Sequence, residues 1–338
     1  MDLRYWTNTN NTWITPDDIF AHSAKVIPVI VITVISIFLG TFGNIFTILA
    51  IIFTKKLRTT ENIFLVNLAL ADLFVSSFVN IFSLVGAVAG EVYFKDKRVL
   101  CVFIGFFCLV CCLVSLFNIT AVAFNRFIFI CHHNYYRGMF TPTKSLIIAI
   151  SLWVFAAILE CVNFMPWGNH AYDKKTLTCV WDRTASLGNT IFITILGISL
   201  PVMITTMSYV MIFYHFYQAK ERLNKNRNQS DKKNTLQESK KLMTTLFSLF
   251  VVFAICWLPY AFIALTDVYD TFDPLVHIYS VTFAHMNSCL NPVVYVTNNE
   301  HFRKAFKKIV LFQCRYEQRK VANCSIQETQ LYSITKNG

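Results

Sequence analysis

Charged side chains are scarce in this chain: Asp, Glu, Lys and Arg together account for only 14% of its 338 residues, whereas hydrophobic residues account for 55%. Soluble domains carry about 25% charged residues. So much apolar surface cannot all be buried in one water-soluble core, and lipid must therefore cover part of it. The composition excludes an ordinary soluble domain and predicts a protein embedded in a membrane.

Recognisable catalytic patterns are missing as well. The sequence has no Ser, His and Asp set, no cluster with metal-ligand spacing and no glycine-rich phosphate loop. It also lacks the paired halves and rings of pore-lining charge that are typical of transporters and channels. We therefore expect neither an enzyme nor a transporter.

The sequence does contain seven apolar stretches, separated by polar segments and each long enough for a membrane helix of about 20 residues. Helices are expected because backbone groups in hydrocarbon must find partners within the protein. To within a few residues, the stretches cover Val26–Phe53, Ile63–Val88, Val99–Cys131, Ser145–Met165, Ser186–Tyr217, Leu242–Thr266 and Leu275–Thr297. The predicted fold is all-α, a seven-transmembrane helix bundle over residues 26–297. An extracellular amino terminus (1–25) precedes it, and a cytoplasmic short amphipathic helix and tail (298–338) follow.

The net charge of +11 is spread unevenly around these stretches. With the amino terminus outside, the first two inner loops hold three Lys or Arg residues each and the third inner loop and the tail eight each, against eight on the whole outer side. This asymmetry follows the positive-inside rule. It predicts a multi-pass plasma-membrane protein with an extracellular amino terminus, whose basic face meets the lipid bilayer and a cytosolic partner rather than nucleic acid.

Three covalent features follow from this orientation. Asn10 begins a sequon on the outer side and is a candidate for glycosylation, although sequons also arise by chance. Cys101 lies at the outer start of the third stretch and Cys179 in the polar segment between the fourth and fifth, both on the oxidising side, so we expect them to form a disulfide. Cys314 follows the basic amphipathic stretch Glu300–Phe312 and is a candidate for palmitoylation, with a free thiol as the alternative.

Polar side chains inside apolar stretches are costly in a bilayer and therefore indicate function. Single Ser, Thr or Asn residues often only join helices together, but here they recur on several stretches as Asn44, Asp72, Ser115, Asn287 and Asn291. The Asp72 carboxylate lies in the inner half of the bundle. It needs a cation, a proton or several hydrogen-bond donors there.

Prolines form a second pattern within the last three apolar stretches. Pro201, Pro259 and Pro292 each remove a backbone hydrogen bond and favour a kink. Kinked helices around a polar core can pack in two arrangements, which a conformational switch requires.

One motif on almost every stretch, in this order, resembles the rhodopsin-like (class A) G-protein-coupled receptors. The motifs are Gly43-Asn44, Asn67-Leu68-Ala69-Leu70-Ala71-Asp72, Cys101, Asn125-Arg126-Phe127, Trp153, Pro201, Tyr209, Cys256-Trp257-Leu258-Pro259 and Asn291-Pro292-Val293-Val294-Tyr295. The resemblance implies a receptor that activates a heterotrimeric G protein. It also implies a site for one metal ion, sodium at Asp72, as an allosteric modulator, and no organic cofactor.

The resemblance assigns roles to individual residues. Ser115, Asn287 and Asn291 would complete the sodium pocket around Asp72, beneath Trp257 as the hinge that senses ligand.

At the inner end, the resemblance implies that Arg126 is released on activation to meet the G protein, with Tyr209 and Tyr295 moving in beside it. Most members of the family have an acid before this arginine, and here Asn125 replaces it. The inactive state therefore lacks one ion-pair restraint, which Glu238 could replace.

Within the family, the sequence is most similar to melatonin receptors, which also share Asn125. The similar segments are Phe117-Asn118-Ile119-Thr120, Ile130-Cys131-His132, Phe253-Ala254-Ile255-Cys256-Trp257 and Asn287-Ser288-Cys289-Leu290-Asn291. The likeness implies that Asn163 binds ligand, that Trp181 stacks on it and that the G protein is of the inhibitory type. Four pocket positions depart from that subfamily, namely Arg183, Gly197, Ala261 and His285, which favours a different ligand.

The predicted ligand-binding residues are Asn163, Trp181, Arg183, Cys108, Trp257, Tyr260 and His285. Cys108 stands where amine receptors have an aspartate, which argues against an amine ligand. His285 stands where opsins attach retinal to a lysine, which argues against a retinal protein. We therefore expect a G-protein-coupled receptor for a small extracellular ligand, with a melatonin-like molecule as a candidate. The alternatives are an orphan peptide or lipid receptor and a constitutively active receptor of the same fold.

Overall fold

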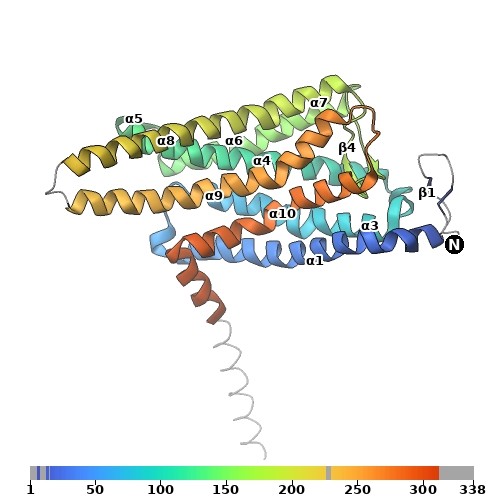
Figure 1. The fold of residues 1–338 in the computed structure, drawn as a ribbon, viewed down its shortest axis with the longest axis horizontal. Coiled ribbons are helices and arrows are strands. Elements are labelled where there is room, and N and C mark those ends of the chain that lie inside the picture. Colours follow the sequence, from blue (N-terminus) through green and yellow to red (C-terminus); the bar gives the residue numbers. More distant parts are fainter. Residues whose placement is uncertain (1–5, 8–12, 15, 226–229, 312–338) are drawn as a thin grey trace, which may run out of the picture.

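The computed structural model describes residues 6, 7, 13, 14, 16–225 and 230–311, and their helices lie roughly parallel along one axis (Figure 1). Seven membrane-spanning segments follow one another along the chain. Their elements are α1 Pro16–Phe53; α2 Asn62–Phe74, η2 Val75–Val79 and α3 Asn80–Phe94; α4 Arg98–Cys131; α6 Pro142–Cys161 and η3 Val162–Phe164; α7 Leu187–Ile193, η4 Thr194–Ser199 and α8 Leu200–Lys225; α9 Ser230–Thr266; and α10 Pro274–Asn298.

The predicted seven-helix bundle is confirmed. Among the described residues, six helices are long and apolar enough to cross a membrane. The seventh segment, α10, is more polar because His277, His285, Asn287 and Asn291 lie on it, and all four side chains are buried. These inward-facing groups lower the mean hydropathy of α10, although they do not contact lipid.

Short elements connect the spans. They are η1 Lys55–Leu57, α5 His133–Met139 and the hairpin of β3 His170–Asp173 and β4 Thr178–Trp181, with β1 Trp6–Thr7 paired to β2 Trp13–Ile14 near the amino terminus. A final helix over residues 300–311 turns away from α10 and confirms the predicted amphipathic segment (Figure 1).

Two boundaries differ from the sequence-based expectation. The first helix begins at Pro16 rather than near Val26. We expected the segment 220–241 to be a polar connection, but α8 continues to Lys225 and α9 begins at Ser230. Lys, Glu and Gln are good helix formers, so a polar composition does not end a helix by itself.

The β3–β4 hairpin, which hydropathy did not predict, covers one end of the bundle, called here the hairpin end. His170 pairs with Trp181 and Tyr172 with Cys179 across the two strands. The predicted disulfide joins Cys179 to Cys101 in the first turn of α4, with the two Cα atoms 5.3 Å apart. The Tyr172 hydroxyl also donates a 3.0 Å hydrogen bond to the carbonyl of Gly86 in α3. The hairpin is therefore fastened to two spans.

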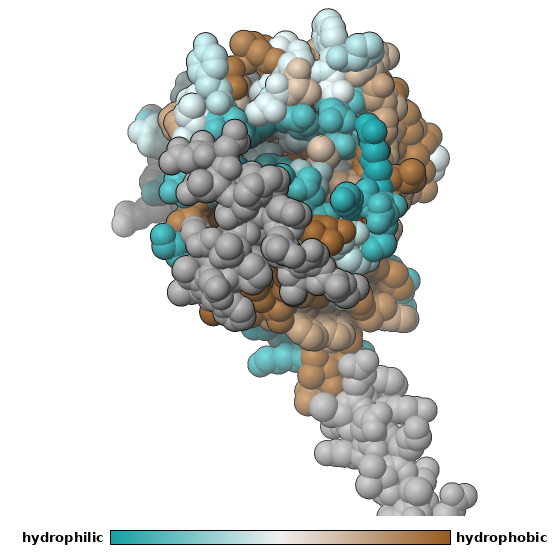
Figure 2. Space-filling model, turned by 90° about the vertical axis from the view of Figure 1, so that its right-hand side faces the viewer, coloured by the Kyte–Doolittle hydropathy of each residue, from teal (hydrophilic) through white to brown (hydrophobic). Residues whose placement is uncertain are grey.

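Apolar side chains lie both between the helices and on their outer surfaces. Large residues on the flanks are exposed, for example Phe38, Phe42, Ile147 and Ile158. Figure 2 looks onto the hairpin end, where hydrophilic residues ring the centre and hydrophobic residues lie along the flanks. This distribution matches a bundle that is surrounded by lipid and open to water at its ends.

Close packing of α1 on α10 generates a testable prediction. A Cβ atom at Gly43 would lie 2.9 Å from Cβ and Cγ of Pro292, whose ring cannot move aside. We expect Gly43→Ala to destabilise the bundle by about 1–3 kcal/mol through overpacking. The measurement is the melting temperature of the purified protein. Gly138→Ala is the matched control, because nothing lies within 4 Å of its new Cβ. Equal melting temperatures for the two variants would contradict the prediction.

Candidate functional site

A fully buried carboxylate, Asp72, lies in the middle of the bundle. The Ser115 hydroxyl from α4 donates to its Oδ1 over 2.9 Å, and the Asn291 amide from α10 donates to its Oδ2 over 2.7 Å. Three segments of the chain therefore meet at one charge. The structure brings together three of the four residues predicted for the sodium pocket through direct hydrogen bonds.

Further amide side chains on α1 and α10 are buried in the bundle. The amide nitrogen of Asn44 donates hydrogen bonds to the carbonyls of Gly40 and Ser288, both over 2.9 Å. The side-chain oxygens of Asn44, Asn287 and Asn291 are buried and have no hydrogen-bond partner among the described residues. Oxygen atoms of amides and carboxylates are the ligands that hard cations prefer. The residues present thus have the right chemistry to hold a sodium ion.

Sequence reasoning missed the π-helical turn η2, which begins three residues after Asp72. There the Ser76 hydroxyl donates to the Asp72 carbonyl over 2.7 Å. The second π-turn, η4, directly precedes Leu200 and Pro201. A proline cannot donate in the helical ladder and its ring crowds the preceding turn, which gives a physical reason for the wider turn.

Trp257 links the polar centre to the hairpin end. It stacks on Phe253 with 5.8 Å between ring centroids and meets Tyr260 edge-on at 6.1 Å. The indole also contacts the apolar cluster that contains Cys108. Trp257 also packs on the cluster of Val281 and Ala284 on α10, so its displacement would disturb the packing of α4, α9 and α10.

Four more predicted ligand-binding residues lie around Trp257 or closer to the hairpin end. The Cys108 thiol of α4 lies 3.5 Å from Nε2 of His285 on α10, and both side chains are buried. Tyr260 and Trp181 are also buried, and Trp181 packs against Leu109 and Leu113 on α4. This group presents aromatic, thiol and imidazole surfaces without a carboxylate. It suits a neutral or weakly polar molecule.

A small cavity lies beside His285, between α1, α3, α10 and the hairpin. Its volume is about 20 Å³, which is enough for one water molecule. Asn80 lines it, and neither polar atom of that buried amide has a partner among the described residues. Sequence reasoning missed Asn80, although an amide in an apolar stretch is itself a signal.

Asn163, predicted to bind ligand, is fully engaged with protein partners. Its amide nitrogen donates to Glu160 over 2.7 Å, and its oxygen accepts from Asn189 over 2.5 Å. Glu160 also pairs with His170 of the hairpin at 2.5 Å. The sequence held a signal for Glu160, a carboxylate inside an apolar stretch, but its histidine partner comes from the connection that follows.

Arg183, also predicted to bind ligand, belongs to an ionic clasp between three connections at the hairpin end. It pairs with the Asp270 carboxylate and donates to the Asp267 carbonyl over 2.7 Å. Lys175 adds contacts to the Asp270 carboxylate at 3.0 Å and to the Phe272 carbonyl at 2.8 Å. The clasp formed by Arg183, Lys175, Asp267 and Asp270 ties the β3–β4 turn and the β4–α7 connection to the α9–α10 connection.

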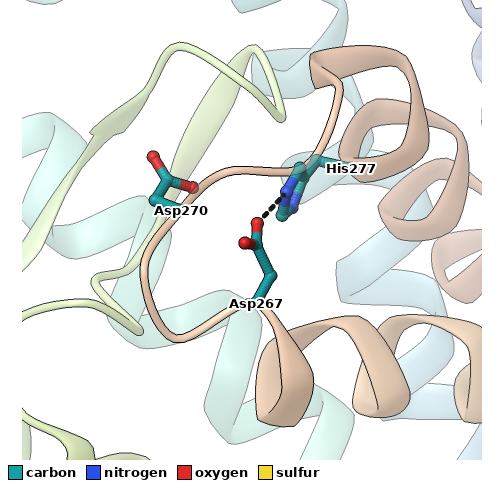
Figure 3. Close-up of side chains that lie close together, drawn as sticks. All are labelled: Asp267, Asp270 and His277. Carbon is teal, nitrogen blue, oxygen red and sulfur yellow. Dashed lines mark hydrogen bonds and ion pairs between the residues drawn. The ribbon is translucent and has the colours of Figure 1, made fainter.

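Figure 3 shows the acidic side of this clasp together with His277. The Asp267 carboxylate bonds to Nε2 of His277 over 2.8 Å, whereas no bond joins Asp270 to that pair, although one of its oxygens lies within 4.8 Å of both. Two carboxylates and an imidazole could in principle hold a metal ion. However, Arg183 and Lys175 already supply the positive charge that these carboxylates need.

At the opposite end, called here the Arg126 end, the predicted switch residues are buried. Arg126 pairs with Glu61 at the start of α2. Asn125 is completely buried, and neither of its polar atoms has a partner among the described residues. Tyr209 and Tyr295 lie in the same apolar cluster, and Tyr295 stacks on Phe302 at 4.9 Å. Sequence reasoning missed Glu61.

Three expectations lie outside the described part of the chain. Asn10 and Cys314 fall outside the described residues, and Glu238 lies where α9 is described by its backbone alone.

Known proteins resemble this chain in sequence and in fold. Residues 43–295 match the family described as 7 transmembrane receptor (rhodopsin family). Melatonin receptor type 1A of Gallus gallus is 31% identical over 84% of this chain and 80% of its own length. Melatonin receptor type 1B of Homo sapiens is 31% identical over 80% and 74%. Squid rhodopsin shares the fold, with a TM-score of 0.76 over 92% of this chain and 91% of its own, at 19% identity.

The clasp generates a prediction about pH. Burial acts to raise the pKa of Asp267, but the amides of Thr271 and Phe272, His277 and Arg183 outweigh it, so the pKa lies below the ordinary value. A lowered folded-state pKa means that ionised Asp267 stabilises the fold at neutral pH. That contribution is lost as the pH falls from about 4 through the folded pKa.

We expect the parent to melt about 2 °C or more above Asp267→Asn at pH 7, with the difference shrinking toward pH 3. The measurement is thermal unfolding of both proteins over this range. A difference that stays constant with pH would show that the charge of Asp267 does not stabilise the clasp.

Proposed function

The chain belongs to the rhodopsin family of seven-transmembrane receptors and is related to melatonin receptors, and we propose that it converts binding of a small extracellular ligand into activation of a heterotrimeric G protein. One observation carries the proposal. Packed side chains connect the two ends of the bundle: Trp257 packs on the cluster that contains Cys108 and on the cluster that contains Phe253. Phe250 packs on that second cluster and on the cluster of Tyr209 and Tyr295 at the Arg126 end. A soluble ligand at one end thereby has a physical route to a partner at the other.

The hairpin end faces the outside of the cell in this proposal. The Cys101–Cys179 disulfide at that end supports the orientation, because disulfides persist in an oxidising compartment. The basic segments at the Arg126 end support it too, by the positive-inside rule. The amino terminus is then extracellular and Arg126 faces the cytoplasm.

The ligand binds among Cys108, His285, Trp257, Tyr260 and Trp181. These residues favour a neutral, partly aromatic molecule, and an indole such as melatonin is the first to test. Asn163 and Arg183 contribute only if a ligand replaces their present protein partners. In this proposal Asn163 and Arg183 support the walls of the pocket without contacting the ligand, since each is already paired with protein groups.

Ligand binding shifts an existing equilibrium between two packings of the kinked helices. Pro259 in α9 and Pro292 in α10 allow this change, because neither completes the helical hydrogen-bond ladder. In the active packing, Arg126 leaves its partner and meets a G protein of the inhibitory type. The sequence relationship to melatonin receptors supports that choice of G protein.

The coupling is tested by nucleotide exchange on inhibitory-type G protein, in membranes with and without melatonin. We expect the parent to stimulate exchange and Arg126→Ala to abolish the stimulation at unchanged surface expression, since the guanidinium is the contact. Arg58→Ala, at an exposed arginine of the same end, should leave exchange unchanged. Equal exchange by Arg126→Ala and the parent would refute the role. Basal nucleotide exchange without a response to melatonin would support coupling to the G protein and show that the ligand is a different molecule.

We also propose that sodium binds at Asp72, Ser115, Asn287 and Asn291 and stabilises the inactive packing. When bound, the ion supplies a positive charge to the carboxylate at the centre of the bundle. We expect NaCl, compared with equal choline chloride, to raise the melting temperature of the parent by about 2 °C or more. Asp72→Asn should remove the difference between the salts. The same difference in both proteins would count against the site.

A further inference from the structure

Arg126 is a charged side chain in an apolar environment. Its side chain is only 5% exposed, and its neighbours in the cluster at this end are mainly Phe, Leu, Ile and Val residues. A buried guanidinium needs an opposite charge or several hydrogen-bond acceptors. The free energy of removing an unpaired charge from water is far larger than the free energy gained from packing it against apolar groups. The preceding residue, Asn125, is neutral and supplies no such charge.

Glu61 supplies it from a different helix. Its carboxylate pairs with Arg126 and is only 21% exposed. The turn before α2 places it there: the Asn62 amide donates to the Leu57 carbonyl over 2.6 Å, and Phe64 N–H donates to the Glu61 carbonyl over 3.1 Å. The ring of Phe129 covers the guanidinium from another side, with 5.6 Å between Cζ and the ring centroid.

We propose that Glu61 is the counter-ion of Arg126 and restrains it in the inactive receptor, in place of an acid at position 125. This inference rests on the proposed function of Arg126. The acidic partner of Arg126 therefore comes from the start of α2, which packs beside α4, instead of from the preceding position on α4 itself. The chain keeps the restraint although Asn125 alone predicts its loss.

The position of Glu61 has a mechanical consequence. The pair joins the start of α2 to α4, and among the described side chains neither partner comes from α8 or α9. Movement of α9 by itself therefore does not separate the two partners, whereas an incoming partner or a shift of α4 against α2 breaks the pair.

The test uses the full-length receptor and its basal nucleotide exchange, without ligand. Glu61→Gln keeps the shape and removes the charge, so we expect basal exchange to rise about fivefold as the inactive packing loses its restraint. The double variant Glu61→Gln/Asn125→Asp returns a carboxylate beside Arg126 and should bring exchange back toward the parent level. Glu300→Gln is the matched control at the same end, because Glu300 forms an exposed pair with Lys304 at 2.6 Å. It should leave exchange unchanged.

The outcomes separate two failures. Unchanged basal exchange in Glu61→Gln, or a rise that Asn125→Asp does not reverse, would overturn the role of Glu61. If the parent and all variants activate no G protein, the proposed function fails, and the pairing is then decided by melting temperature. A decrease in Glu61→Gln that the double variant recovers supports the pair, and no decrease overturns it.

Discussion

The structure depends on pairing charges that have been removed from water. Asp72, Glu160 and Arg126 are each at most 4% exposed, and each meets partners from other segments of the chain. The partners of Asp72 come from α4 and α10, those of Glu160 from the hairpin and η3, and that of Arg126 from the start of α2. Because an unpaired buried charge is so costly, these contacts fix the relative positions of helices that apolar packing alone would leave free to slide.

The two ends of the bundle are held in different ways. The hairpin end is closed by a disulfide, by the Glu160–His170 pair and by the clasp of Arg183, Lys175, Asp267 and Asp270. These links join the hairpin to α4, to α6 and to the α9–α10 connection, so that end forms a rigid frame. A frame of this kind keeps a ligand site pre-formed, which lowers the entropic cost of binding.

Hydropathy predicted the seven spans well, because the bilayer imposes one length and one composition on each of them. The Cys101–Cys179 disulfide was also predictable, because Cys101 at the outer start of its span and Cys179 in an outer connection both lie on the oxidising side. The contacts of Glu61, Glu160 and Arg183 could not be predicted, because each residue pairs with a residue on another segment. A single sequence does not specify how far one helix is shifted along its neighbour. The π-turns at Val75–Val79 and Thr194–Ser199 and the β3–β4 hairpin escaped prediction for a related reason, as local propensity is overruled there by tertiary packing.

The contrast between the ends decides where the molecule can move. Opening the hairpin end requires breaking a covalent bond or several ion pairs at once. At the Arg126 end, the carboxylate that balances the buried charge among the described side chains is that of Glu61, which is itself partly exposed to solvent. A partly exposed pair is worth far less than a disulfide, because solvent screens it. The free energy of a ligand bound near Trp257 is therefore most effective at the Arg126 end, where the Arg126–Glu61 pair is a weaker restraint than the links at the hairpin end.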